Sequence, residues 1–62
     1  MKLNDIVMRA EDRPVTAALV LAFSDGAKEH AAPFDPDLWA LIEYEEGGQG
    51  WWPLTDLLPD QG

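Results

Sequence analysis

Carboxylates at short spacing are the side chains of this sequence with the clearest potential for chemistry. Asp35 and Asp37 are two positions apart, and so are Glu43 and Glu45. On a β-strand, positions two apart share a face, so Glu43 and Glu45 would point the same way. Such a pair could act as general acid and base, or could bind a hard cation. No calcium-loop spacing accompanies the pairs, and no histidine lies at a metal-ligand offset from them. We therefore expect a solvated acidic surface, with no metal and no cofactor.

Nucleophilic catalysis has little support in the sequence. The chain contains one histidine, His30, one serine, Ser24, and no cysteine. Ser24 precedes Asp25-Gly26, where turn formation explains it fully. A working Ser–His pair would also need a third, orienting group and an oxyanion site. We expect a protein that is not an enzyme; an active site composed from several subunits is the alternative.

The net negative charge and the tryptophans are concentrated in the second half of the chain. Residues 1–28 contain four bases and four acids, whereas residues 29–62 contain eight acids, no Lys or Arg, and all three tryptophans, Trp39, Trp51 and Trp52. An acidic surface mixed with large aromatic residues is a candidate docking face for a basic partner. A calculated pI near 4.1 argues against direct binding of nucleic acid or of an anionic membrane.

Length and composition indicate one small folded domain covering residues 1–62. The chain is 47% hydrophobic with a net charge of −8, which is too apolar for disorder throughout. Without cysteine its stability must come from packing, or from packing together with self-association. We expect no signal peptide at the N-terminus, because no apolar region follows Lys2, and the longest apolar run, Ala17–Phe23, is far too short to span a membrane. We expect a cytoplasmic protein.

Turn signals divide the first part of the chain into three segments. Leu3–Ala10 has a β-branched centre, which predicts a strand, and residues 11–14 form a charged turn ending in proline. Val15–Phe23 has the length of a buried strand closed by the turn residues 24–26, although its alanines leave a helix open. The two prolines within Ala27–Asp37 predict a long loop.

Leu38–Glu46 admits two interpretations. As a helix over 36–46 it would begin with Asp35 at the N-cap and Pro36 at the first helical position, giving an α+β fold. Its glutamates would then crowd the negative end of the helix dipole. As a strand it would lead into a glycine-rich hairpin loop, residues 46–50, and its apolar face would carry Leu38, Ala40, Ile42 and Tyr44.

The last segment, residues 51–59, begins extended and then contains turn residues. Pro53 prevents a ladder hydrogen bond at its position, and Thr55 or Asp56 could cap one helical or 3₁₀ turn. Trp51 and Trp52 are neighbours on this strand, so one should be buried and the other at least partly exposed. Residues 60–62 should be frayed.

Residues 43–59, EYEEGGQGWWPLTDLLP, resemble the closing hairpin of small SH3-like and Tudor-like barrels. In those families a strand ends in an acidic-glycine turn, and the next strand carries an aromatic residue and a Pro-Leu-x-x-Leu type segment that forms a 3₁₀ turn. The resemblance implies a mainly β, SH3-like barrel that serves as a binding module. We expect its core to contain Ile6, Val7 or Met8, Val15, Leu19, Leu21, Phe23, Trp39, Leu41 or Ile42, Tyr44, Leu54, Leu57 and Leu58.

The functional expectation is an acidic protein-interaction module. Its sharpest form is an inhibitor that occupies the basic surface of a nucleic-acid-binding protein by mimicking nucleic acid, similar in size and charge to small phage and mobile-element proteins such as anti-CRISPR inhibitors. Two alternatives are an acidic half that only provides solubility, and a structural subunit that forms a homodimer through its tryptophan edge. The expected partner-binding residues are Asp35, Asp37, Glu43, Glu45, Glu46 and Asp56, with Trp51 or Trp52 as the apolar anchor.

Overall fold

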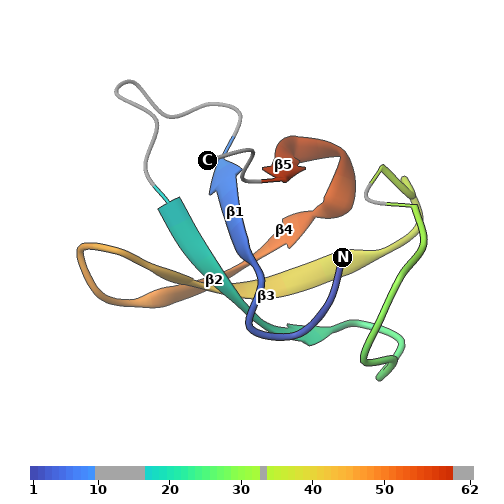
Figure 1. Cartoon of the computed structure of the whole chain (residues 1–62), viewed down its shortest axis with the longest axis horizontal. Helices are drawn as coiled ribbons and strands as arrows, with labels where there is room; N and C mark the ends of the chain where they lie inside the picture. Colours follow the sequence, from blue (N-terminus) through green and yellow to red (C-terminus); the bar gives the residue numbers. More distant parts are fainter. Residues whose placement is uncertain (10–16, 33, 60–62) are drawn as a thin grey trace.

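The computed structural model describes residues 1–9, 17–32 and 34–59, and shows one antiparallel sheet (Figure 1). The strands follow each other across the sheet in the order β4-β3-β2-β1-β5. Their bounds are β1 Ile6–Arg9, β2 Ala17–Phe23, β3 Trp39–Tyr44, β4 Gln49–Pro53 and β5 Leu57–Pro59, and a 3₁₀ turn, η1, Leu54–Asp56, joins β4 to β5. The predicted mainly β class and the turn near the C-terminus are therefore confirmed.

The alternative of a helix over 36–46 is wrong, because β3 occupies most of that range. The Asp35-Pro36-Asp37 segment forms a turn instead of a helix start. The Asp35 carboxylate accepts the backbone N–H of Asp37 at 2.9 Å, and the Leu38 N–H donates to the Asp35 carbonyl at 3.3 Å. An Asp side chain that binds the backbone two residues on is typical of such turns.

One face of the bent sheet encloses the core. Val7, Ala18, Val20, Phe23, Ala40, Ile42, Leu54 and Leu57 are all buried. Alternation along β2 places Ala18 and Val20 inside, and a β-bulge between Val20 and Ala22 shifts the pattern by one residue. The bulge returns Phe23 to the interior, since an extra residue in one strand reverses the faces that follow it.

Three residues predicted in the core are exposed instead: Ile6 at 43%, Trp39 at 45% and Leu58 at 43%. Each precedes or follows a residue that occupies the inner face of the same strand, Val7, Ala40 or Leu57. Successive side chains of a strand point to opposite faces, so these three residues must face outward.

Two further core predictions on β2 are corrected. Leu19 and Leu21 are only half-buried, while the smaller Ala18 and Val20 take the inner positions. Of the alternatives left open, Ile42 is buried and Leu41 is half-buried. Val7 is likewise buried and Met8 half-buried, whereas Val15 lies outside the described residues.

Glycines close the β3–β4 hairpin at the predicted loop. Gly47 and Gly48 have φ values of 102° and 90°, in the region that disfavours other residues. The Gly47 N–H donates to the Tyr44 carbonyl at 3.0 Å, and the Tyr44 N–H donates to the Gly48 carbonyl at 3.0 Å.

Within the described ranges, no helix is long and apolar enough to cross a membrane.

Candidate functional site

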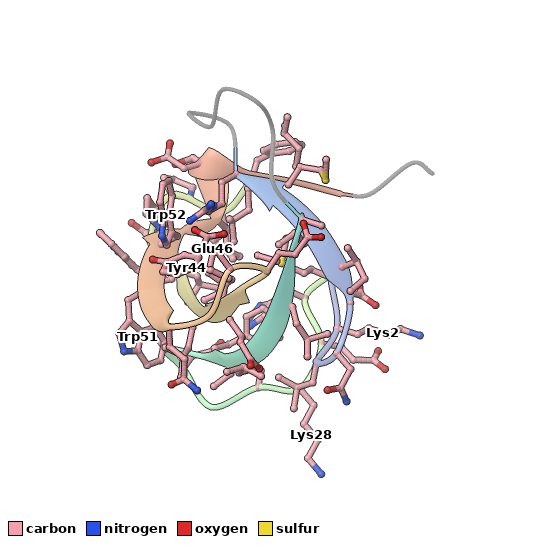
Figure 2. The ribbon with its side chains drawn as sticks, turned by 90° about the vertical axis from the view of Figure 1, so that its left-hand side faces the viewer. Lys2, Lys28, Tyr44, Glu46, Trp51 and Trp52 are labelled. Carbon is pink, nitrogen blue, oxygen red and sulfur yellow. The ribbon has the colours of Figure 1, made fainter. Side chains whose placement is uncertain are left out.

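The inner face of the hairpin carries Tyr44 and Trp52, with Glu46 close by (Figure 2), and the cationic side chain of Arg9 lies against both rings. The Arg9 guanidinium carbon lies 4.3 Å from the centroid of the Tyr44 ring and 5.9 Å from that of the Trp52 ring. Its Nη2 also lies 3.3 Å from a carboxylate oxygen of Glu46. The Trp52 indole N–H donates to the Tyr44 hydroxyl at 2.9 Å. These four residues, the arginine cluster, close one end of the core.

Gly50 makes this packing possible. A Cβ at this position would overlap the Tyr44 hydroxyl oxygen. The hydroxyl of Tyr44 therefore occupies the space that any other residue at position 50 would fill, and it is held there by Trp52. The chain needs glycine here for close approach, not for an unusual backbone conformation.

The sequence prediction missed Arg9. It is 8% exposed and lies two residues after buried Val7, on the same face of β1. Strand alternation extended by one step beyond Val7 would have placed it inside. Its partner Glu46, predicted in the docking face, is still 60% exposed at its side chain but has one oxygen engaged by Arg9.

The outer face of the hairpin carries an aromatic band made of Trp39, Leu41 and Trp51. Leu41 pairs directly with Trp51 across β3 and β4, and Trp39 lies two residues before Leu41. Trp39 is 45% and Trp51 51% exposed. Trp51 is thus the outward residue of the tandem, as one of the two was expected to be, and Trp52 packs against the core. Trp52 is therefore not available as an exposed anchor, whereas Trp39 is.

Acidic residues follow the aromatic band at the hairpin end. Glu43 is on the outer face of β3, two residues beyond Leu41, and pairs with Gln49. Glu45 continues in the same direction past the end of the strand, and both glutamates are exposed. Neither carboxylate forms an ion pair or hydrogen bond within the described part of the chain.

The other predicted acidic residues lie at the opposite end of the hairpin. Asp35 and Asp37 precede β3, and Asp56 follows β4 in η1, which is joined to this region by the Leu54 N–H donating to the Leu38 carbonyl at 3.0 Å. The length of β3 puts about 17 Å between the two acidic groups. The predicted acidic face is therefore two separate groups with the aromatic band between them.

Positive charge in the described structure lies elsewhere. Lys2 and Lys28 lie on the side of the molecule away from Trp51 and Trp52 (Figure 2), and Arg9 is buried within the arginine cluster. Lys2 is also 3.8 Å from a carboxylate oxygen of Glu29. Within the described residues, the outer hairpin face thus presents carboxylates and aromatic rings without an exposed base.

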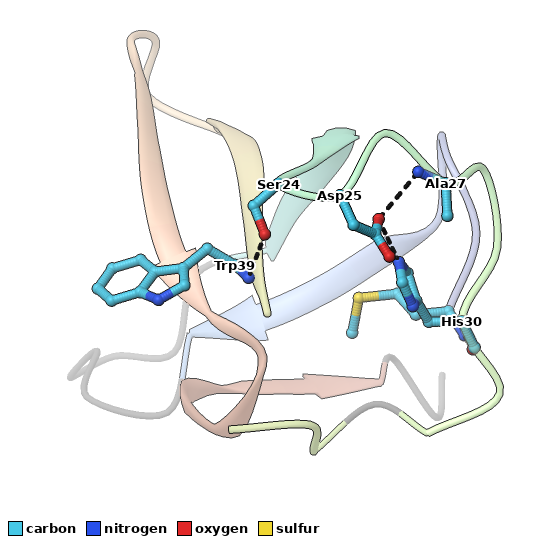
Figure 3. A network of polar contacts seen from close by, with 6 residues as sticks. Ser24, Asp25, Ala27, His30 and Trp39 are labelled. Atoms are coloured by element: carbon cyan, nitrogen blue, oxygen red, sulfur yellow. Dashed lines mark hydrogen bonds and ion pairs between the residues drawn. The ribbon is translucent and has the colours of Figure 1, made fainter. Parts of the chain in front are cut away.

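The residues considered for catalysis are assembled into turns (Figure 3). The Ser24 hydroxyl accepts the Trp39 backbone N–H at 3.1 Å. His30 Nε2 lies 3.1 Å from an Asp25 carboxylate oxygen, and its ring packs edge-on against Phe23. The Ala27 N–H donates to the same Asp25 oxygen at 2.9 Å. This hydrogen bond is the main reason why the pKa of Asp25 is lowered, and His30 lowers it further. His30 is bound to Asp25 and Ser24 to the backbone, so the two do not form a nucleophile–base pair.

Among the described residues, no group of three or more His, Cys, Asp or Glu side chains is placed to hold a metal ion. No family model matches this chain, and no match was found among curated proteins or solved structures.

Proposed function

We propose that this chain is a non-enzymatic interaction module that docks a basic protein surface on the outer face of its β3–β4 hairpin. The observation that carries the proposal is the pair of exposed tryptophans flanking Leu41, followed on the same face by carboxylates that have no partner among the described residues. Exposed apolar patches rimmed by charge are typical of protein-interaction sites, and tryptophan is enriched among residues that dominate binding.

Charge decides the class of partner. Glu43 and Glu45 are exposed at one end of the band, and Asp37 is exposed at the other. A partner carrying Lys or Arg on both sides of an apolar patch would match this order. Such a surface is common on nucleic-acid-binding proteins, so inhibition of one of these proteins by occupying its basic site is the sharpest form of the proposal.

We also propose that the fold is an SH3-like barrel. The strand order β4-β3-β2-β1-β5, and the 3₁₀ turn between β4 and β5, support this assignment. Fold alone does not assign a function, so the interaction proposal depends on the surface and not on the resemblance.

Affinity capture tests the proposal. The tagged protein is used to retain partners from lysate at low and high salt, in parallel with Trp39→Ser/Trp51→Ser and Glu43→Lys/Glu45→Lys variants. Glu46 is left unchanged because it contacts Arg9. We expect a basic protein that is retained by the wild type only and released by salt. Equal capture by all three proteins, or binding that is independent of salt, would contradict the proposal.

Self-association is a second candidate, favoured by the exposed aromatic band itself. Two copies could bury their bands against each other in a symmetric dimer. Light scattering at micromolar concentration should then give a dimer mass for the wild type and a monomer mass for Trp51→Ser.

A further inference from the structure

A hollow lies on the outer face of the sheet beside the aromatic band. It has a volume of about 430 Å³ and is open to solvent. Its lining residues come from three adjacent strands and the start of the hairpin loop: Ile6, Ala17, Ala18, Leu19, Glu43, Tyr44 and Glu45. Ile6 pairs with Leu19, and Leu19 pairs with Glu43, so one row of side chains crosses it from apolar to acidic.

The lining separates into an apolar wall and an acidic rim. Ile6 is 43% exposed and Leu19 is half-buried, and Ala17, two residues before Leu19 on the same face, is a small side chain that leaves room beside them. Glu43 and Glu45 supply carboxylates that have no partner in the described part of the chain. A lysine or arginine matches both parts, because its methylene stem packs on apolar surface while its charged head binds carboxylates.

The hollow and the aromatic band are continuous. Leu41 lies two residues before Glu43 on the same face of β3 and pairs with Trp51. Strand spacing puts about 12 Å between Leu19 and Trp51, which three to four residues of extended chain would span. One extended segment could therefore reach both places.

We propose that this hollow binds a Lys or Arg side chain from an extended segment of the partner protein. An apolar side chain three or four residues away on that segment packs on the aromatic band. This inference rests on the proposed docking function and adds the chemistry that the docked segment must carry.

The test uses a short synthetic peptide of Ser and Thr with one Lys and one Leu about four residues apart. A matched peptide replaces Lys with norleucine, which keeps the stem and removes the charge. Binding is followed by backbone amide shifts in ¹⁵N spectra and by tryptophan fluorescence. We expect the amides of Ala17, Leu19 and Glu43 to shift with the Lys peptide, and the norleucine peptide to bind about tenfold more weakly.

Two kinds of variant address the hollow separately. Ala17→Leu fills the hollow with a larger side chain. Glu43→Gln/Glu45→Gln removes the negative charge of the hollow with little change of shape. Each variant should lower the affinity for the Lys peptide about tenfold. Glu29→Gln is the matched control on a distant segment and should leave affinity unchanged. Thermal unfolding of each variant separates lost binding from lost folding.

Three results would contradict the proposal that the hollow binds a basic side chain, and they can be told apart. If Trp51→Ser abolishes peptide binding while the hollow variants do not, docking at the aromatic band survives and the basic side chain binds elsewhere. If the same amides shift with protein concentration alone, the occupant is a second copy of the chain. If the Lys peptide does not bind although affinity capture succeeds, the docked segment lacks this chemistry.

Discussion

Two adjacent tryptophans show how differently the two faces of the β3–β4 hairpin are used. Trp52, on the inner face, packs against the core, donates to Tyr44 and lies near the Arg9 guanidinium. Trp51, on the outer face, is 51% exposed and pairs with half-buried Leu41. The same residue type has a defined partner on one face and is open to solvent on the other.

The difference separates residues that the fold requires from residues that it does not. A chain of this size buries only about 60% of its unfolded surface, so exposed apolar residues are expected. Their arrangement is more informative than their number, because Trp39, Leu41 and Trp51 form one band beside carboxylates that have no partner in the part of the chain that the structure describes. Substitutions on the inner face should therefore reduce stability, and those on the outer face should reduce binding.

Replacing each tryptophan by alanine gives the largest contrast. Trp52→Ala removes core packing and the hydrogen bond to Tyr44, and should cost about 3 kcal/mol of unfolding free energy. Trp51→Ala should cost less than about 1 kcal/mol but abolish capture of a basic partner. Urea unfolding followed by circular dichroism measures the first quantity. Equal losses of stability in the two variants would contradict the division into two faces.

Gly50→Ala tests how closely Tyr44 packs against the backbone of β4 on the inner face. The added Cβ would overlap the Tyr44 hydroxyl, so the ring must move away from Trp52 and Arg9. Overpacking of this kind costs about 1–3 kcal/mol. Gln49→Ala, at the exposed neighbouring position, is the control and should stay within about 0.5 kcal/mol of the wild type. Thermal unfolding compares the two, and similar midpoints would show that Tyr44 can relocate freely.

Arg9→Met asks how much the buried cation contributes. Methionine keeps most of the length but removes the charge that faces Tyr44 and Trp52, which should cost about 1–2 kcal/mol. Glu46→Gln removes the charge of the partner carboxylate and should cost below about 1 kcal/mol, since that side chain is 60% exposed. A larger loss for Glu46→Gln, measured by urea unfolding, would mean that the ion pair and not the aromatic contact holds Arg9.

The positions of the strands could be predicted from the sequence, but the face on which each side chain lies could be predicted only in part. Alternation over Leu38, Ala40, Ile42 and Tyr44 correctly placed the inner face of β3. The same alternation assigns Trp39 to the outer face, but its apolar neighbours in sequence favoured the core. Local composition was misleading because burial in a strand depends on the face and not on adjacent residues.

The remaining errors come from features that alternation cannot reveal. The bulge in β2 reverses the faces between Val20 and Phe23, and nothing in an Ala-Leu-Val-Leu-Ala run marks its position. The site was predicted in part: Glu43, Glu45 and Trp51 share one face. The hollow depends on pairing Ile6 and Leu19 with Glu43 across three strands, and such register is not readable from one segment.

The smallest expected effect concerns a carboxylate that folding uses, in contrast to the glutamates of the outer face. The Ala27 N–H and His30 lower the pKa of Asp25 below its ordinary value of 3.8. A lowered folded-state pKa gives stability that is present above the unfolded value and is lost as pH falls through the folded value. Asp25→Asn keeps an oxygen for Ala27 but cannot titrate, so its thermal midpoint should fall less steeply than the wild type's below about pH 4. Gln49→Ala, which changes no titratable group, is the control and should leave that acid limb unchanged. An acid limb as steep in Asp25→Asn as in the wild type would mean that the contacts of this carboxylate with Ala27 and His30 do not stabilise the folded state.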